Sequence, residues 1–101
     1  MRRKSLVSPI ILRDVYVQTG DYTAKFIIDP RESNSIETVS VSMRNADGCD
    51  MPFASKRWGT KLTVSFKIDE KTPDGAAVID MTLLNKSKSE SREAFRVWIV
   101  K

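Results

Sequence analysis

Apolar and polar residues alternate in several short runs of the chain. A period of two is typical of a β-strand with one face in a core and one face in water. No run shows the 3.6-residue period of an amphipathic helix, so we expect an all-β protein. The three clearest runs predict these inward-facing sets: Tyr22, Ala24, Phe26 and Ile28; Val39, Val41 and Met43; Leu62, Val64, Phe66 and Ile68.

Two later runs are apolar on both faces, and the cost of burying polar groups decides their orientation. In the run 76–84, the opposite orientation would bury Asp80 and Thr82. In the run 94–100, the interpretation leaves Trp98 and Val100 outside. The predicted inward residues are Ala77, Ile79, Met81 and Leu83 in the first run, and Phe95, Val97 and Ile99 in the second.

The first predicted strand, residues 10–18, changes its phase midway. Ile10 and Leu12 share one parity, whereas Val15 and Val17 have the other. Such a change indicates either a bulge or a strand that leaves one sheet and joins another.

Turn-forming residues separate the runs. The longest connector is 45–59, in which we expect a short edge strand around residues 51–54, and the polar stretch 85–93 predicts an exposed, mobile hairpin loop. Six or seven short strands with turns about every ten residues favour an antiparallel two-sheet sandwich, and a small closed barrel is the alternative.

Three short motifs give this order of elements a resemblance to the bacterial immunoglobulin-like domains of surface, adhesion and phage structural proteins. They are Gly20-Asp21 before the second strand, Trp58 before the fifth, and Thr72-Pro73-Asp74-Gly75 before the sixth. The resemblance implies an immunoglobulin-like sandwich of six to seven strands, with a role in building, spacing or adhesion and no catalysis.

The chain departs from that family after its sixth strand. The family's usual Asp-x-x-Gly-Asn turn is replaced by residues 85–90, which contain no glycine. The departure predicts a longer or less ordered last hairpin, and it removes a carboxylate that is often associated with calcium in the family.

A chain of 101 residues fits one domain, which we divide into a basic N-terminal arm (1–9) and the sandwich (10–101). No apolar run approaches the roughly 20 residues of a membrane span. The single cysteine, Cys49, excludes an internal disulfide, and the basic start lacks the uninterrupted apolar stretch of a secretory signal. Both features favour a reducing compartment.

The net charge of +4 is spread along the chain, and Arg2, Arg3 and Lys4 form the one dense basic cluster. The absence of histidine removes the commonest general acid and base and the commonest transition-metal ligand. We therefore expect no catalytic residue and no cofactor.

A cluster of acidic residues is the strongest candidate for a metal site in the sequence. Asp69, Glu70 and Asp74 stand beside Lys67 and Lys71, and their spacing differs from that of an EF-hand loop. We interpret the cluster as turn chemistry and expect no bound metal.

Exposed apolar residues on the outer strands predict a protein interface. Trp98 and Val100 on the last strand, joined by Tyr16 if the first strand is its neighbour, would form an apolar patch. In this hypothesis the arm residues Arg2, Arg3 and Lys4 bind an acidic surface of the partner.

The predicted function is that of a non-catalytic structural module, a virion accessory or decoration protein of a bacteriophage. Its expected partners are capsid or tail subunits, with assembly in the host cytoplasm. The alternative is a carbohydrate or cell-surface binding module that holds a glycan with Phe53 and Trp58. We do not expect nucleic acid as a partner, because a tryptophan at a strand entrance, as Trp58 is, is typical of a core residue, and charged residues in loops are typical of a soluble surface.

Overall fold

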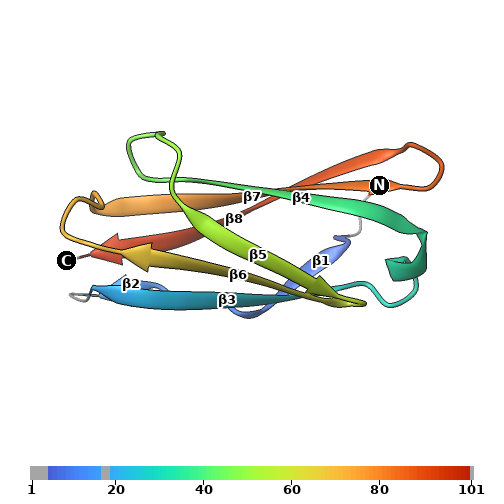
Figure 1. The fold of residues 1–101 in the computed structure, drawn as a ribbon, viewed down its shortest axis with the longest axis horizontal. Coiled ribbons are helices and arrows are strands. Elements are labelled where there is room, and N and C mark those ends of the chain that lie inside the picture. The colour runs from blue at the N-terminus through green and yellow to red at the C-terminus, as the bar shows by residue number, and fades with distance from the viewer. Residues whose placement is uncertain (1–4, 17–18, 101) are drawn as a thin grey trace.

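The computed structural model describes residues 5–16 and 19–100, which form two facing β-sheets and one short 3-10 turn, Ser33–Ser35 (Figure 1). None of the described helices is long and apolar enough to cross a membrane. The strands are β1 (Val7–Ile11), β2 (Val15–Tyr16), β3 (Gly20–Ile28), β4 (Ile36–Arg44), β5 (Phe53–Trp58), β6 (Lys61–Ile68), β7 (Gly75–Asn85) and β8 (Glu90–Val100).

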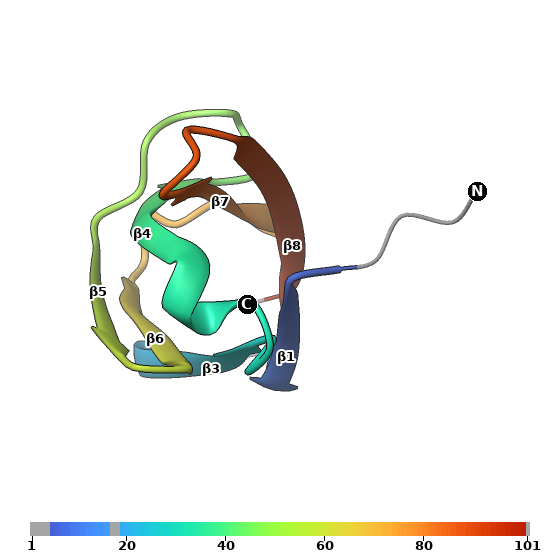
Figure 2. The ribbon, with the colours of Figure 1, turned by 90° about the vertical axis from the view of Figure 1, so that its right-hand side faces the viewer.

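The strand order is that of the immunoglobulin fold. One sheet has the order β1-β3-β6-β5 and the other β2-β8-β7-β4. Figure 2 shows the two sheets viewed down the long axis of the molecule. When β1 and β2 are counted together as the first strand, β3 to β8 become strands two to seven. One sheet then contains strands one, two, five and four, and the other contains strands seven, six and three beside β2. The predicted all-β, two-sheet sandwich is therefore confirmed.

The first strand crosses from one sheet to the other, as its change of phase predicts. β1 pairs antiparallel with β3, with a register shift between Pro9 and Ile11, whereas β2 pairs in parallel with β8. β1 begins at Val7, whose side chain is buried. Residues 7–9 thus belong to the sheet, although the sequence pattern predicts an arm that extends to residue 9.

The core lies between the two sheets and is filled by the predicted inward faces. All four predicted residues of β6 are buried, as are the four of β7, while Phe95 and Tyr22 are half-buried and pack against the core. The rings of Phe26 and Phe95 join the two sheets, with centroids 4.8 Å apart. Alternation along the chain therefore predicts most of the core, although Val7, Ile36 and Met51 are also buried and belong to no predicted set.

The connector before β6 is more regular than the sequence predicts. The edge strand is β5, Phe53–Trp58, and it pairs antiparallel with β6 along its whole length. Its sequence shows no alternation because one face is in solvent and Arg57 occupies the half-buried face near the sheet's edge. The side chain of Arg57 donates hydrogen bonds to the carbonyl oxygens of Ser33, Ile36 and Gly59.

The last hairpin is shorter than predicted, because β7 ends at Asn85 and β8 begins at Glu90. Lys88 adopts a positive φ of 68°, a conformation that glycine often supplies in such turns. Asn85 Oδ1 accepts a hydrogen bond from the Ser89 N–H at 2.8 Å. These two residues close the loop without a glycine.

Candidate functional site

Trp98 and Val100 lie on the outer face of β8, with 52% and 41% of their surface exposed. Val97 and Ile99 fill the core, so the residues that alternate with them point outward. The predicted orientation of the last strand is confirmed. The use of this exposed pair as an interface stays a prediction.

Two apolar residues of β7 extend the exposed surface. Ala76 lies opposite Trp98 in the β7–β8 register, and Val78 is the next outward residue along β7. We term Ala76, Val78, Trp98 and Val100 the tryptophan patch. The sequence interpretation missed the two β7 residues, although apolar residues at outward positions of the run 76–84 were a signal for them.

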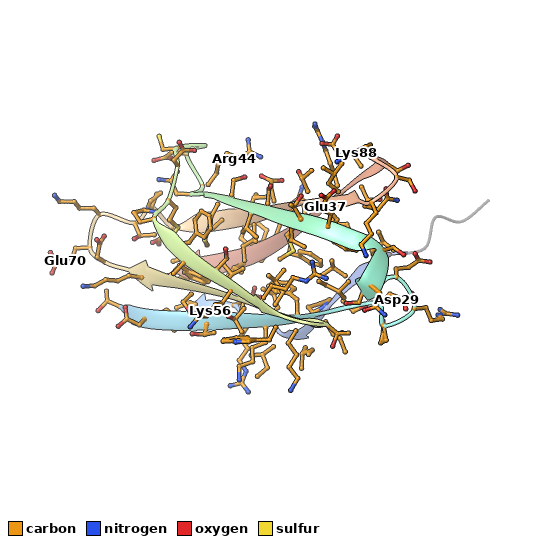
Figure 3. The ribbon with its side chains drawn as sticks, turned by 45° about the vertical axis from the view of Figure 1, so that its right-hand side comes forward. Asp29, Glu37, Arg44, Lys56, Glu70 and Lys88 are labelled. Carbon is orange, nitrogen blue, oxygen red and sulfur yellow. The ribbon has the colours of Figure 1, made fainter. Side chains whose placement is uncertain are left out.

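An ion pair lies on the same face of the sheet beyond Val78. Arg44, labelled in Figure 3, is opposite Val78 in the β4–β7 register, and its Nη2 is 2.9 Å from Asp80 Oδ2. Arg96, which is also exposed, lies opposite Val78 in the β7–β8 register. The apolar patch therefore meets charged residues at Val78, as in an interface with a polar rim.

The first strand reaches the end of β8 beside the patch. Val15 lies opposite Ile99, Tyr16 lies opposite Val100, and the Trp98 N–H donates a hydrogen bond of 3.1 Å to Asp14 Oδ1. The expected neighbourhood of the first and last strands is therefore confirmed. The side chain of Tyr16 lies outside the described part of the structure, as do Arg2, Arg3 and Lys4.

The carboxylate of Glu93 on β8 holds the start of the described chain. Its Oε1 accepts a hydrogen bond of 2.6 Å from Ser5 Oγ, and its Oε2 accepts the N–H groups of Leu6 at 3.1 Å and Val7 at 3.0 Å. Because Glu93 is five residues from Trp98, Ser5 lies about 17 Å along β8 from the tryptophan patch. No pattern along the chain predicts this clamp.

Phe53 and Trp58 do not share an aromatic platform. They stand five residues apart on β5 and so face opposite sides of the sheet. Phe53 packs against the core, whereas Trp58 is 55% exposed and has Lys56 Nζ 5.2 Å from its ring centroid. The assignment of Trp58 to the core was wrong, and the two rings cannot stack on one glycan.

Among the acidic residues before β7, Asp69 stabilises the turn. Asp69 Oδ1 accepts hydrogen bonds from the N–H groups of Lys71 at 2.9 Å and Thr72 at 3.1 Å, and from Thr72 Oγ1 at 3.2 Å. The bond from the Lys71 N–H is the main reason why the pKa of Asp69 lies below its ordinary value. Residues 5–16 and 19–100 contain no group of three potential metal ligands.

The lowered pKa of Asp69 predicts a pH-dependent contribution to stability. The ionised carboxylate favours the fold above the ordinary aspartate pKa of about 4, and this contribution is lost as the pH falls through the lower pKa of the folded state. We expect Asp69→Asn to lower the urea midpoint slightly at neutral pH. At about pH 3 the difference between wild type and variant should shrink; a difference that grew in acid would contradict the argument.

The strand order and the two facing sheets give the chain an immunoglobulin-like β-sandwich fold. No protein-family model and no curated protein matches the chain. Among solved structures, it is similar to CopC from Methylosinus trichosporium OB3b, with a TM-score of 0.58 and 14% identity over 87% of this chain and 84% of CopC. This likeness supports the fold alone.

A second solved structure is the major pilin subunit BcpA of Bacillus cereus, with a TM-score of 0.43 and 13% identity. The match covers 88% of this chain but 36% of the pilin chain. Neither likeness assigns a ligand or a partner to this chain, so its function must be argued from its own surfaces.

Proposed function

We propose that the chain is a non-catalytic module that binds a larger protein assembly through the tryptophan patch. The observation that carries this proposal is the exposed indole of Trp98, next to Val100 and opposite Ala76 on one sheet face. Aromatic residues are enriched at protein interfaces, where a buried tryptophan often contributes most of the binding energy.

The assembly that suits this chain best is a bacteriophage particle, with capsid or tail subunits as partners and assembly in the host cytoplasm. A small immunoglobulin-like module with one exposed cysteine needs no oxidising compartment to fold. The arm residues Arg2, Arg3 and Lys4 then bind an acidic surface of the particle. Ser5, the first described residue after this arm, donates a hydrogen bond to Glu93 on β8.

Sedimentation with purified particles tests the proposal. The particles are those of the virus whose genome encodes the chain. We expect Trp98→Ala to weaken binding by about 30-fold, which corresponds to a loss of about 2 kcal/mol at a buried interface residue. Trp58→Ala is the matched control, because it removes an exposed indole from the opposite sheet.

Three outcomes decide between the claims. Wild-type binding by a folded Trp98→Ala variant would disprove the role of the patch, and a chain that does not sediment with particles would disprove the phage assignment. Removal of residues 1–4 should weaken binding mainly at low salt; binding that is unchanged at every salt concentration would disprove the role of the arm alone.

A further inference from the structure

The charges of the described chain are unevenly distributed. Of the 17 basic residues, Arg2, Arg3, Lys4 and Lys101 lie outside the described part, and the other 13 balance the 13 acidic residues. The outer face of the β1-β3-β6-β5 sheet nevertheless carries four lysines on its strands, Lys25, Lys56, Lys61 and Lys67, against one acid, Asp21. Because Asp21 is opposite Lys67, the other three lysines have no acid beside them on this face.

Strand pairing gathers these three lysines around Trp58. Thr63 on β6 lies between Lys56 on β5 and Lys25 on β3, and Lys61, the outward residue before Thr63, lies opposite Trp58. With strands about 4.8 Å apart, the backbones of Lys25 and Lys56 are about 10 Å from each other. We term Lys25, Lys56, Lys61 and Trp58 the lysine face; Lys56 is labelled in Figure 3.

Four other cations of the described residues form ion pairs. Arg31, Arg44, Lys88 and Arg92 each lie within 3.5 Å of a carboxylate oxygen. Among the described residues, no carboxylate forms an ion pair with the lysines of the lysine face. A lysine on an edge strand hinders aggregation, but Lys25 and Lys61 stand on the inner strands β3 and β6, where that explanation does not apply.

We propose that the lysine face binds single-stranded nucleic acid without sequence preference. Lysine ammonium groups act as point charges for backbone phosphates. The exposed indole of Trp58 offers a surface on which a base can stack, and this pairing of aromatic and basic groups is typical of single-strand binding. The sequence pattern argued against nucleic acid by placing Trp58 in the core. In the structure Trp58 is exposed, and its lysine neighbours lie on strands.

This proposal is independent of the proposed function. The lysine face belongs to the β1-β3-β6-β5 sheet and the tryptophan patch to the other sheet, so their outer faces point in opposite directions. Either surface can therefore fail its test without affecting the other.

Salt-dependent binding of an oligodeoxythymidine tests the lysine contacts. Fluorescence anisotropy with the full chain and a strand of about 12 nucleotides gives the slope of log K against log salt concentration. Three phosphate contacts contribute about −2 to that slope. The triple variant Lys25→Gln/Lys56→Gln/Lys61→Gln should lose this contribution and bind at least about tenfold more weakly at low salt.

A matched triple variant separates the face from net charge. Lys71→Gln/Lys86→Gln/Lys88→Gln removes the same charge from exposed loop residues. This control variant should keep the phosphate contacts of the lysine face. Its slope of log K against log salt concentration should therefore be steeper by about 2 than that of the triple variant of the lysine face. Equal losses in the two triple variants, or no binding by the wild type at low salt, would overturn the proposal.

Tryptophan fluorescence distinguishes a base from another polyanion. In a Trp98→Phe background, emission comes from Trp58 alone, and stacking on a base should quench it. Trp58→Ala should weaken oligonucleotide binding by about tenfold. The proposal would be overturned if the oligonucleotide bound without quenching and if heparin displaced it at a lower concentration than unlabelled oligonucleotide does. That result would assign the lysine face to sulfated polymers.

Discussion

Replacement of Arg57 by methionine is expected to lower the free energy of unfolding by about 3 kcal/mol. The guanidinium joins the edge strand β5 of one sheet to the 3-10 turn before β4 and to the start of β4 in the other sheet. Its Nε donates to the Gly59 carbonyl at 3.0 Å, its Nη1 to Ile36 at 3.2 Å, and its Nη2 to Ser33 at 3.0 Å. Methionine keeps much of the side-chain volume but leaves partly buried carbonyl oxygens without these donors, which is the costly part of the change.

Urea denaturation measures this loss, and two variants control for it. Arg96→Met removes an arginine from the exposed face of β8 and should change the free energy of unfolding by less than about 0.5 kcal/mol. Arg57→Lys keeps the charge without the planar fork and should lose most of the stability. If Arg57→Met costs no more than Arg96→Met, the three hydrogen bonds do not stabilise the fold.

Replacement of Gly75 by alanine is expected to cost about 3 kcal/mol as well. Gly75 has a φ of +124°, which a residue with a Cβ rarely adopts, and its added Cβ would lie 2.8 Å from the Cβ of Ala46. Alanine therefore carries two costs, one for the positive φ and one for the overlap with Ala46. To relieve them, the backbone must leave the left-handed region or the β4–β5 connector must move. The glycine of the predicted corner is thus required both by its backbone angle and by a close approach.

Gly48→Ala isolates the first of these terms. Gly48 also has a positive φ, of 83°, but nothing lies within 4 Å of an added Cβ, so alanine should cost about 1 kcal/mol there. In thermal or urea unfolding, Ala46→Gly combined with Gly75→Ala should recover part of the stability. Equal costs for Gly75→Ala and Gly48→Ala would show that the overlap with Ala46 is relieved without penalty.

Much of the fold follows from local patterns. Alternation predicts the buried faces of β3, β6, β7 and β8, because in a two-sheet sandwich the inward side chains must be apolar. The change of phase in residues 10–18 indicates either a bulge or a first strand that joins both sheets, and the structure shows that it joins both. Glycine and proline predict the corner before β7, because few other residues adopt its backbone angles.

The remainder depends on contacts between distant segments. β5 shows no alternation of apolar and polar residues, because an edge strand buries little apolar surface. Its inward residue Arg57 donates hydrogen bonds to carbonyl groups from elsewhere in the chain. The lysine face joins residues from β3, β5 and β6, and no spacing along the chain reveals that they are neighbours. The tryptophan patch was half predicted, since alternation orients Trp98 but only the register places Ala76 beside it.

The parallel pairing of β2 with β8 affects how the sandwich bears tension. The two strands run in the same direction, so a pull on the N-terminal side of β2 and on the C-terminal end of β8 moves them in opposite directions along their axes. Their backbone hydrogen bonds are then loaded together in shear, instead of opening one after another as in an unzipped hairpin. A module held at both ends would load this short pairing in shear, after the antiparallel pairing of β1 with β3 on its N-terminal side.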